Sequence, residues 1–294
     1  MPEKTVMDDD DFDLADYAQN LVLQGFIGAL KLLPYRWRVT YGARGLAWVI
    51  APFAGWHQRV RRNLALVLPD LALAEVERLV RAVPANAMRT MIEIYSPHAF
   101  KSRLAKTPIS GAGLAALDAA RVEGRGVILI SGHFGNYDVP RAVLAARGHS
   151  IGALYKPMQN RYFNHHYRAA IAAIATPVFP SDRRGLVEMV RHLRAGGLIG
   201  MLIDIHAPRG APLRFFGRRA MTAVSAAEMA LKHNTLLVPV YGLRLPDGTN
   251  FELIIEPPIP HTTAEAMTQA LNDSLEIQVR AHPEQWFWIH RRWK

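Results

Sequence analysis

The sequence predicts an α/β fold, in which a mostly parallel or mixed sheet is flanked by helices and preceded by an N-terminal helical extension. From residue 123 onward, short β-type runs alternate with segments of helix length, which is typical of a sheet covered by helices. The run 126–131 is apolar almost throughout, as expected for a strand buried on both faces. The 294 residues, 50% apolar and 20% charged, suffice for a sizeable core.

The expected elements follow in chain order. Residues 1–13 form an acidic tail, with one Lys against six acids. Residues 14–107 form a helical region that faces a membrane, and residues 108–294 form the α/β domain. In that domain we expect strands at 126–131, 151–155, 177–180, 198–203, 236–241 and 251–256, and helices at about 142–148, 160–175, 184–195, 220–233 and 263–281.

The charge balance is strongly basic. The formal net charge is +10, and because the tail carries −5, the remainder carries +15. Such a body favours polyanionic partners: nucleic acid, anionic lipid headgroups, phosphorylated substrates or an acidic protein. The absence of cysteine excludes a disulfide scaffold, a zinc-thiolate or iron–sulfur site and a cysteine nucleophile.

The N-terminal region has the composition of a membrane-facing segment. Two charge-free stretches, 17–30 and 45–58, have 14 residues each, whereas a spanning helix needs about 20. The first has an apolar stripe at helical spacing, and residues 35–62 hold six arginines and no acid among aromatic residues. We therefore expect a helix lying in the headgroup plane, with a single span as a second possibility. The alternative is a helical subdomain packed on the core.

A histidine follows the first long strand directly. Residues 131–138 read Ser-Gly-His-Phe-Gly-Asn-Tyr-Asp, which places His133 where reacting groups of open α/β sheets lie. With His133 in the turn and Asp138 in the first helical turn, the imidazole can donate its Nδ1–H to the carboxylate and keep Nε2 as a general base. The alternative is a structural His beside an unrelated Asp.

These residues resemble a known family. The segment 133–138 is similar to the H-x4-D motif of the lysophospholipid acyltransferase superfamily, in the His-Phe-Gly-Asn form of the lipid A biosynthesis acyltransferases. Residues 202–204, 212–220 and 283–294 are similar to further motifs of that family, in the same order, although Ile205 replaces a frequent Gln. The Phe-Pro-Glu-Gly motif of glycerol-phosphate acyltransferases is missing, which disfavours a glycerolipid acceptor.

The resemblance implies a glycerolipid acyltransferase-like fold and an acyl transfer. The donor would be an acyl carrier protein thioester, and the acceptor a hydroxyl of a phosphorylated lipid A precursor at the cytoplasmic face of the inner membrane. An acyltransferase acting on another glycolipid or on a phospholipid is the alternative. No cofactor and no metal is expected. The acyl chain length, the acceptor hydroxyl and the oligomeric state are open.

The resemblance also suggests roles for further residues. Arg168 is the candidate for oxyanion stabilisation, and Asp204 is expected to orient an Arg or the acceptor. Amides around Gly135 at the helix N-terminus would offer further donors to the oxyanion. The predicted substrate-binding residues are Gly135, Asn136, Lys156, Arg209, Arg214 and Arg218, the cations being complementary to phosphate and to the acidic carrier protein.

Three other functions fit less well. A metal hydrolase would use His133, Asp138, Asp204 and His206, but no recognised ligand spacing is present. A serine hydrolase would need Gly-x-Ser-x-Gly, which is absent around Ser131 and Ser225. A nucleic-acid-binding protein would explain the charge, but no binding motif appears and no nucleic-acid partner is expected.

Overall fold

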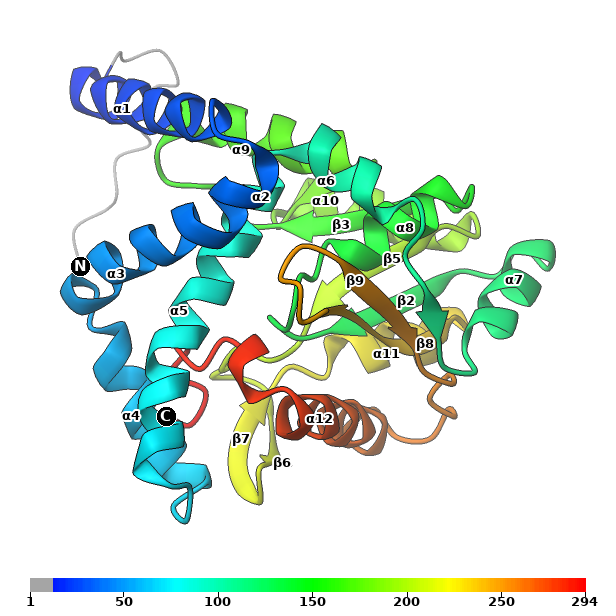
Figure 1. Cartoon of the computed structure of the whole chain (residues 1–294). Helices are drawn as coiled ribbons and strands as arrows, with labels where there is room; N and C mark the ends of the chain where they lie inside the picture. Colours follow the sequence, from blue (N-terminus) through cyan, green and yellow to red (C-terminus); the bar gives the residue numbers. More distant parts are fainter. Residues whose placement is uncertain (1–12) are drawn as a thin grey trace, which may run out of the picture.

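The computed structural model describes residues 13–294 (Figure 1). The predicted acidic tail therefore lies outside the described residues except for Asp13, whose side chain caps the first helix. The predicted α/β class is confirmed, because a seven-stranded sheet has the order β1-β9-β8-β2-β5-β3-β4. Strands β8, β2, β5, β3 and β4 are parallel, β9 runs antiparallel to β8, and β1 pairs in parallel with β9.

Six strands of the sheet lie close to their expected positions, whereas the short edge strand β1 was not predicted. The sheet consists of β1 (Ile109–Ser110), β2 (Val127–Ser131), β3 (Ile151–Tyr155), β4 (Val178–Pro180), β5 (Leu198–Leu202), β8 (Leu236–Arg244) and β9 (Phe251–Ile255). Successive residues of β2 point to opposite faces, and both faces are buried. Hydrophobic burial on two sides explains why this strand has no polar alternation.

Helices cover both faces of the sheet. One face packs against α6 (Pro97–Leu104), α7 (Leu114–Val122), α8 (Val139–Ala146) and α9 (Arg161–Ile174). The other face packs against α10 (Arg183–Arg194), α11 (Ser225–His233) and α12 (Ala264–Ala281). Two apolar cores therefore enclose β2, and the end of β2 can present a loop at the edge of a rigid layer.

One expected helix begins later than predicted. Residues 211–222 form a two-stranded hairpin of β6 (Ala211–Phe215) and β7 (Arg218–Thr222), so α11 begins at Ser225 and not near 220. The hairpin turn is Phe216-Gly217, and both residues have positive φ (54° and 68°). Positive φ at both central positions is what a type I′ turn requires.

The N-terminal helices stand beside one end of the sheet. They are α1 (Leu14–Lys31), α2 (Tyr35–Trp37), the π-helical η1 (Arg38–Gly42), α3 (Ala43–Phe53), α4 (Trp56–Val67) and α5 (Leu73–Ile94). Helix α5 runs down this side of the molecule (Figure 1), and one apolar core joins α4 and α5 to the hairpin and to the C-terminal tryptophans. That shared core fixes the helical region against the α/β part.

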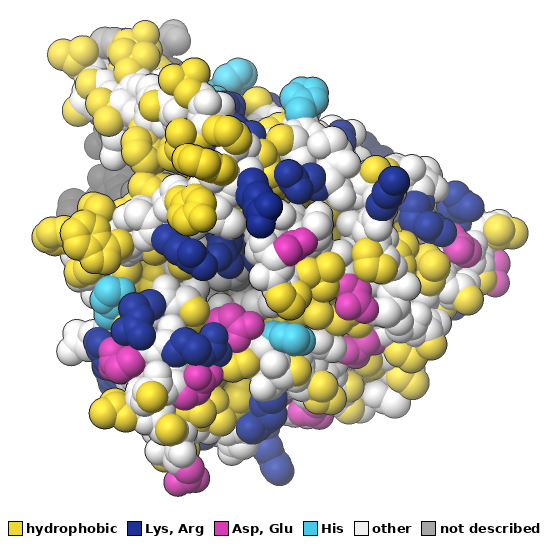
Figure 2. All heavy atoms as spheres, in the orientation of Figure 1, with side chains coloured by type: hydrophobic (Ala, Val, Ile, Leu, Met, Phe, Trp, Pro, Cys, Tyr) yellow, Lys and Arg dark blue, Asp and Glu magenta, His cyan; other side chains and the backbone are white. Residues whose placement is uncertain are grey.

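The helices α1 to α3 have apolar side chains on two faces, one packed against the core and one exposed. Leu23 and Ile27 pack against the main core, as expected of a subdomain that covers it. Large hydrophobic side chains are nevertheless exposed along α1 to α3, namely Leu14, Tyr17, Leu21, Val22, Phe26, Trp37, Tyr41, Trp48, Val49, Ile50 and Phe53. Yellow side chains accordingly gather on that side in Figure 2. In the described part of the chain, no helix is both long and apolar enough to span a bilayer.

Candidate active site

Two glycines let the backbone close around His133. A Cβ on Gly132 would lie 3.1 Å from Asp204 Oδ2 and 2.7 Å from the Leu275 side chain. A Cβ on Gly135, where φ is +54°, would lie 2.0 Å from the carbonyl oxygen of Gly242. The turn after β2 therefore passes closer to β5, α12 and β8 than any residue with a side chain allows.

His133 is held by Asp204. Its Nδ1 lies 2.8 Å from Asp204 Oδ1, and its backbone N–H donates to Oδ2 at 2.8 Å. Trp286 Nε1 also donates to Oδ2, at 2.9 Å. Burial alone would raise the pKa of the Asp204 carboxyl, but the attraction and hydrogen bonds of His133 hold that pKa well below its usual range. An ionised carboxylate at Nδ1 retains the Nδ1–H tautomer and leaves Nε2 free to accept a proton.

The predicted pairing of His133 with Asp138 is wrong. Asp138 lies at the N-cap of α8, and its carboxylate instead accepts a hydrogen bond from Arg141 Nη1 at 2.5 Å. Arg141 also donates to the carbonyl oxygens of Ile171 and Ala175, on α9 and at its end. The buried ion pair thus ties α8 to α9. The partner of His133 is instead Asp204. Because β2 and β5 are neighbouring parallel strands, the Asp204 carboxylate beyond the end of β5 reaches the imidazole of His133.

His133 lies where two cavities meet. The first, here the sheet-edge cavity, has a volume of about 350 Å³ and lies between the ends of β2, β3 and β5 and the helix α9. The second, the helix-side cavity, has about 290 Å³ and lies between α5 and the C-terminal segment. Most of the side chains that line them are apolar, among them Ile171 and Val240 in the first and Val83 and Met91 in the second. Such walls suit a hydrocarbon chain next to the imidazole.

Few of the predicted cations lie beside these cavities. Lys156 lines the sheet-edge cavity together with His133 and Asp138. Arg168 is exposed on α9, and it is its neighbour Tyr167 that lines the cavity, so the structure does not bring Arg168 to the imidazole. The predicted phosphate-binding cations Arg209, Arg214 and Arg218 are exposed on the β5–β6 loop and the hairpin and line neither cavity.

The predicted substrate contacts of Gly135 and Asn136 are only partly possible. Gly135 lines the helix-side cavity, but its N–H donates to the carbonyl oxygen of Gln285 at 2.9 Å. The Asn136 N–H donates to the carbonyl oxygen of Gly242, and its side chain donates to Glu93 and accepts the N–H of Asp138. These two amides are engaged within the protein and do not face an oxyanion. Asn136 instead fixes the shape of the turn.

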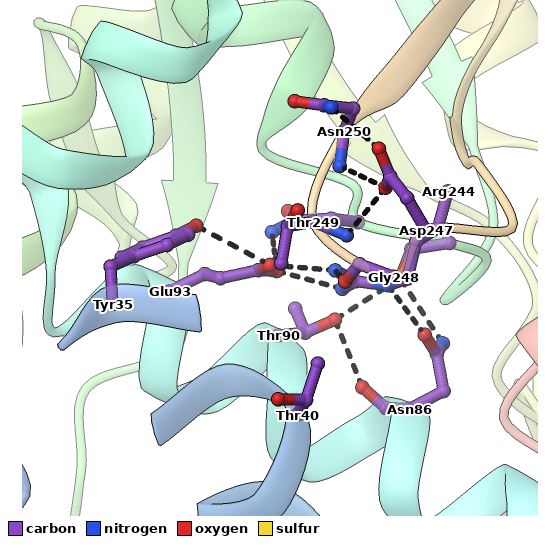
Figure 3. A network of polar contacts seen from close by, with 12 residues as sticks. Tyr35, Thr40, Asn86, Thr90, Glu93, Arg244, Asp247, Gly248, Thr249 and Asn250 are labelled. Carbon is purple, nitrogen blue, oxygen red and sulfur yellow. Dashed lines mark hydrogen bonds and ion pairs between the residues drawn. The ribbon is translucent and has the colours of Figure 1, made fainter. Parts of the chain in front are cut away.

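A buried network lies behind the turn (Figure 3). Arg244 of β8 makes a double ion pair with Glu93 of α5, at 2.6 and 2.7 Å, and its Nε donates to Asn86 at 3.0 Å. Asn86 and Thr90 then donate to the carbonyl oxygen of Gly135, at 3.2 and 3.1 Å. Helix α5 is thereby bonded to the loop that carries His133. Sequence reasoning missed these residues, because nothing in the spacing of Glu93 and Arg244 connects them.

The C-terminal segment completes the site. The Phe287 N–H donates to the carbonyl oxygen of His133 at 3.0 Å, and Trp286 forms an isolated antiparallel bridge with Phe134. The ring of His290 lies edge-on to His133, with the centroids 4.7 Å apart. Burial and the neighbouring His133 lower the pKa of His290 to about 4. Trp288 of this segment is fully buried and serves packing. The only available signal for a role at the site was the similarity of 283–294 to the family's ending.

In the part of the chain that the structure describes, no three His, Cys, Asp or Glu side chains are grouped to hold a metal ion. His133 and Asp204 are joined to each other, and the third contact of Asp204 is a tryptophan. The arrangement is that of a general base with an orienting carboxylate.

Comparison with known proteins connects this arrangement to one chemistry. The chain is 26% identical over 246 residues to the lipid A biosynthesis lauroyltransferase of Escherichia coli K12, covering 80% of this chain and 78% of that protein. It is 25% identical over 249 residues to a phosphatidylinositol mannoside acyltransferase of Mycobacterium tuberculosis H37Rv, covering 81% and 78%. The family profile described as "Bacterial lipid A biosynthesis acyltransferase" matches residues 8–294. With its histidine poised at the sheet edge beside two apolar cavities, the chain belongs to the bacterial lipid A biosynthesis acyltransferase family and is an acyltransferase.

Proposed function

We propose that the protein transfers a fatty acyl chain from acyl carrier protein to a hydroxyl of a lipid A precursor, with His133 as the general base and Asp204 as its orienting partner. The hydrogen-bonded pair of His133 Nδ1 and Asp204 carries the mechanistic part of this proposal. The family and the names of its members support the type of acceptor.

The chemical step needs one base and no covalent enzyme intermediate. His133 Nε2 takes the proton of the acceptor hydroxyl while the oxygen attacks the thioester carbonyl. When the tetrahedral intermediate collapses, the carbon–sulfur bond breaks and the thiolate takes the proton from the imidazolium. Asp204 stabilises the imidazolium and holds the ring orientation throughout. The apolar cavities on either side of His133 suit the acyl chains of donor and acceptor.

A location at the cytoplasmic face of the inner membrane fits the proposal. The outer sides of α1 to α3 expose hydrophobic side chains, of which Trp48 (79% exposed) and Phe53 (92%) are the most accessible on α3. A surface of this kind, next to arginines, suits the boundary between headgroups and acyl chains. We therefore propose attachment in the plane of the membrane.

A phosphatidylinositol mannoside is the second candidate acceptor. The mycobacterial relatives named for it match this chain over as large a share as the lauroyltransferase does. The reaction type and the base would be the same, so only the acceptor pocket distinguishes the two.

Reconstitution tests the proposal. The full-length protein in detergent is given acyl-acyl carrier protein or acyl-coenzyme A, together with a lipid A precursor or a phosphatidylinositol mannoside, and products are identified by mass spectrometry. We expect one added acyl chain on the lipid A precursor with the carrier-protein donor, and none with His133→Ala. Transfer only to the mannoside would contradict the proposed acceptor, and undiminished transfer by His133→Ala would contradict the base. In cells, the mass missing from lipid A without the protein identifies the chain transferred.

A further inference from the structure

A further cavity lies away from His133. It has a volume of about 1010 Å³ and is enclosed by η1 and α3, by α5 and by the β8–β9 turn. Figure 2 shows this hollow facing the viewer, with Lys and Arg side chains around it and hydrophobic side chains of the α1–α3 side next to it. We call it the arginine cavity. It lies on another side of α5 from the helix-side cavity, and the two share only Asn86 and Gln285 as lining residues.

Three arginines of this cavity form no ion pair within the described residues, although the charges of Glu77 and Glu93 act on Arg81 and Arg89 from a distance. Arg61, Arg78 and Arg244 are paired with Glu77, Glu284 and Glu93, respectively. Within residues 13–294, Arg44, Arg81 and Arg89 have neither a hydrogen bond nor an ion pair, although all three line the cavity. The remaining carboxylate, that of Asp247, accepts the backbone N–H groups of Thr249 and Asn250 in its own turn.

Arg89 is the most constrained of the three. Its Nε is buried without any hydrogen-bond partner, and a Cβ on Gly248 would lie 3.9 Å from its guanidinium. Burial and the nearby charges of Arg244 and Arg44 lower its pKa to about 10, against a smaller opposing effect of the Glu93 carboxylate. A half-buried cation that faces other cations and has an unused donor is a position that an anion would stabilise.

The surroundings of the cavity favour an amphiphilic anion over a soluble one. Trp48 lines the cavity and is itself 79% exposed. On the same helix, Val49, Ile50 and Phe53 are exposed. A ligand whose charged group lies among the arginines would therefore have its apolar part beside α3. Guanidinium groups bind phosphate through paired hydrogen bonds, so a phosphate is the anion that fits them best.

We propose that the arginine cavity binds the phosphate group of an anionic lipid, with Arg44, Arg81 and Arg89 as its ligands. The lipid is either a phospholipid of the surrounding membrane or the phosphorylated acceptor. The inference rests on the proposed function only for the second of these. It replaces the hairpin and loop arginines as the phosphate-binding group, because those lie on another part of the surface.

Binding measurements on the full-length protein test this site without requiring turnover. Inorganic phosphate is titrated while the unfolding temperature is followed, and flotation is measured with vesicles of phosphatidylcholine alone or mixed with phosphatidylglycerol. The variants are Arg44→Gln, Arg81→Gln and Arg89→Gln. The matched control is Arg147→Gln, at an exposed arginine beyond the end of α8. Arg44 is exposed, so its replacement leaves the fold intact.

We expect phosphate to raise the unfolding temperature of the wild type and of Arg147→Gln, but not of Arg89→Gln. Each cavity variant should weaken binding to the phosphatidylglycerol vesicles about fivefold, while the control changes little. If the KM for the acceptor in detergent rises in the same variants, the ligand is the acceptor; if it does not, the ligand is a membrane phospholipid. Equal behaviour of Arg89→Gln and Arg147→Gln, or equal binding to both kinds of vesicle, would overturn the proposal.

Discussion

Asp204 shows how one buried carboxylate can serve a loop and a side chain together. It accepts both the backbone N–H and the Nδ1–H of His133, so it determines the position of the residue as well as the orientation of its ring. The indole of Trp286 satisfies the same oxygen as the backbone N–H. A charge that is completely buried needs such partners, because an unpaired carboxylate in this place would take up a proton.

The roles of the two aspartates can be separated by substitution. His133→Ala should lower kcat by about 10²–10⁴, the usual contribution of a positioned base. Asp204→Asn should approach that loss, because the amide presents its NH₂ to Nδ1 and favours the wrong tautomer. Asp138→Asn should retain most of the rate, since the amide oxygen can still accept from Arg141. Steady-state rates of the three variants check this; a loss in Asp138→Asn that exceeds the loss in Asp204→Asn would refute the assignment.

His290 should make the protein less stable in mild acid. Its pKa is lowered to about 4 in the folded state, against about 6.5 in the unfolded chain. Between these values the unfolded state binds the additional proton, so the free energy of unfolding decreases as pH falls from 6.5 to 4. The loss from this group is at most about 3 kcal/mol. Denaturant titrations at several pH values, compared with His290→Asn, measure it; an unchanged slope in the variant would rule the residue out.

The position of His133 could be predicted from the sequence, whereas its partner could not. A histidine between glycines at the end of an apolar strand was sufficient to place it at the sheet edge. Asp138 was close in sequence, but the turn at Gly135 and the bonds of Asn136 direct it toward α9. The true partner is 71 residues away, and only the adjacency of β2 and β5 brings it near.

At the scale of elements, α5 is attached to the sheet by a polar network as well as by apolar packing. Glu93 is completely buried and Arg244 is 4% exposed, yet both are charged groups with several partners. Tyr35 of α2 is a further contact of Glu93, at 3.5 Å. The network thus joins the N-terminal helices, the long helix and the strand β8 behind the turn that carries the base.

Breaking the ion pair of Glu93 and Arg244 should lower the free energy of unfolding substantially. Glu93→Ala leaves the buried guanidinium of Arg244 without a counter-charge and should reduce the free energy of unfolding by about 3–5 kcal/mol. The exposed pair of Arg184 and Glu188 on α10 provides the matched control, for which Glu188→Ala should cost less than about 1 kcal/mol. Chemical denaturation followed by circular dichroism gives both values. Similar small losses in the two variants would show that the network contributes little.

Element types were easier to predict than element order. Most strands of the sheet lie within one or two residues of their expected bounds, although β8 continues to Arg244, because buried apolar runs leave a clear signal. The hairpin at 211–222 was missed because β6 contains a proline and β7 begins with two arginines, neither of which is typical of a strand. The order of the strands in the sheet could not be predicted from the sequence, because β2 pairs with β5 and β8 and both are distant from it in the chain.

At the scale of the whole molecule, the hydrophobic side chains and the charges are unevenly distributed. The exposed hydrophobic residues cluster on α1 to α3, and the arginine cavity opens beside them. The sequence indicated this region by its aromatic residues and six arginines, and membrane attachment stays a prediction. The division of the chain at residue 107 also stays a prediction, although apolar cores extend across it.

Replacing outward side chains of α3 tests the attachment without removing any of the core. Trp48→Glu and Phe53→Glu should each weaken binding to phosphatidylglycerol-containing vesicles at least about tenfold. Each change replaces an apolar side chain that the bilayer would bury with a carboxylate that anionic headgroups repel. Val122→Glu is the control, since Val122 is 85% exposed on α7 at the opposite side of the molecule (Figure 1). Flotation of the three proteins decides the matter, and equal retention would place the attachment elsewhere.

The contacts of Trp286 and Phe287 with the turn around His133 also bear on biosynthesis. Chains are made from the N-terminus, and their structure forms in that direction as it emerges. A nascent chain that already contains His133 and Asp204 still lacks the indole that holds the carboxylate and the backbone N–H that holds the histidine. The site is therefore held in place only once synthesis has passed residue 287, and a chain that stops before residue 286 would lack both contacts.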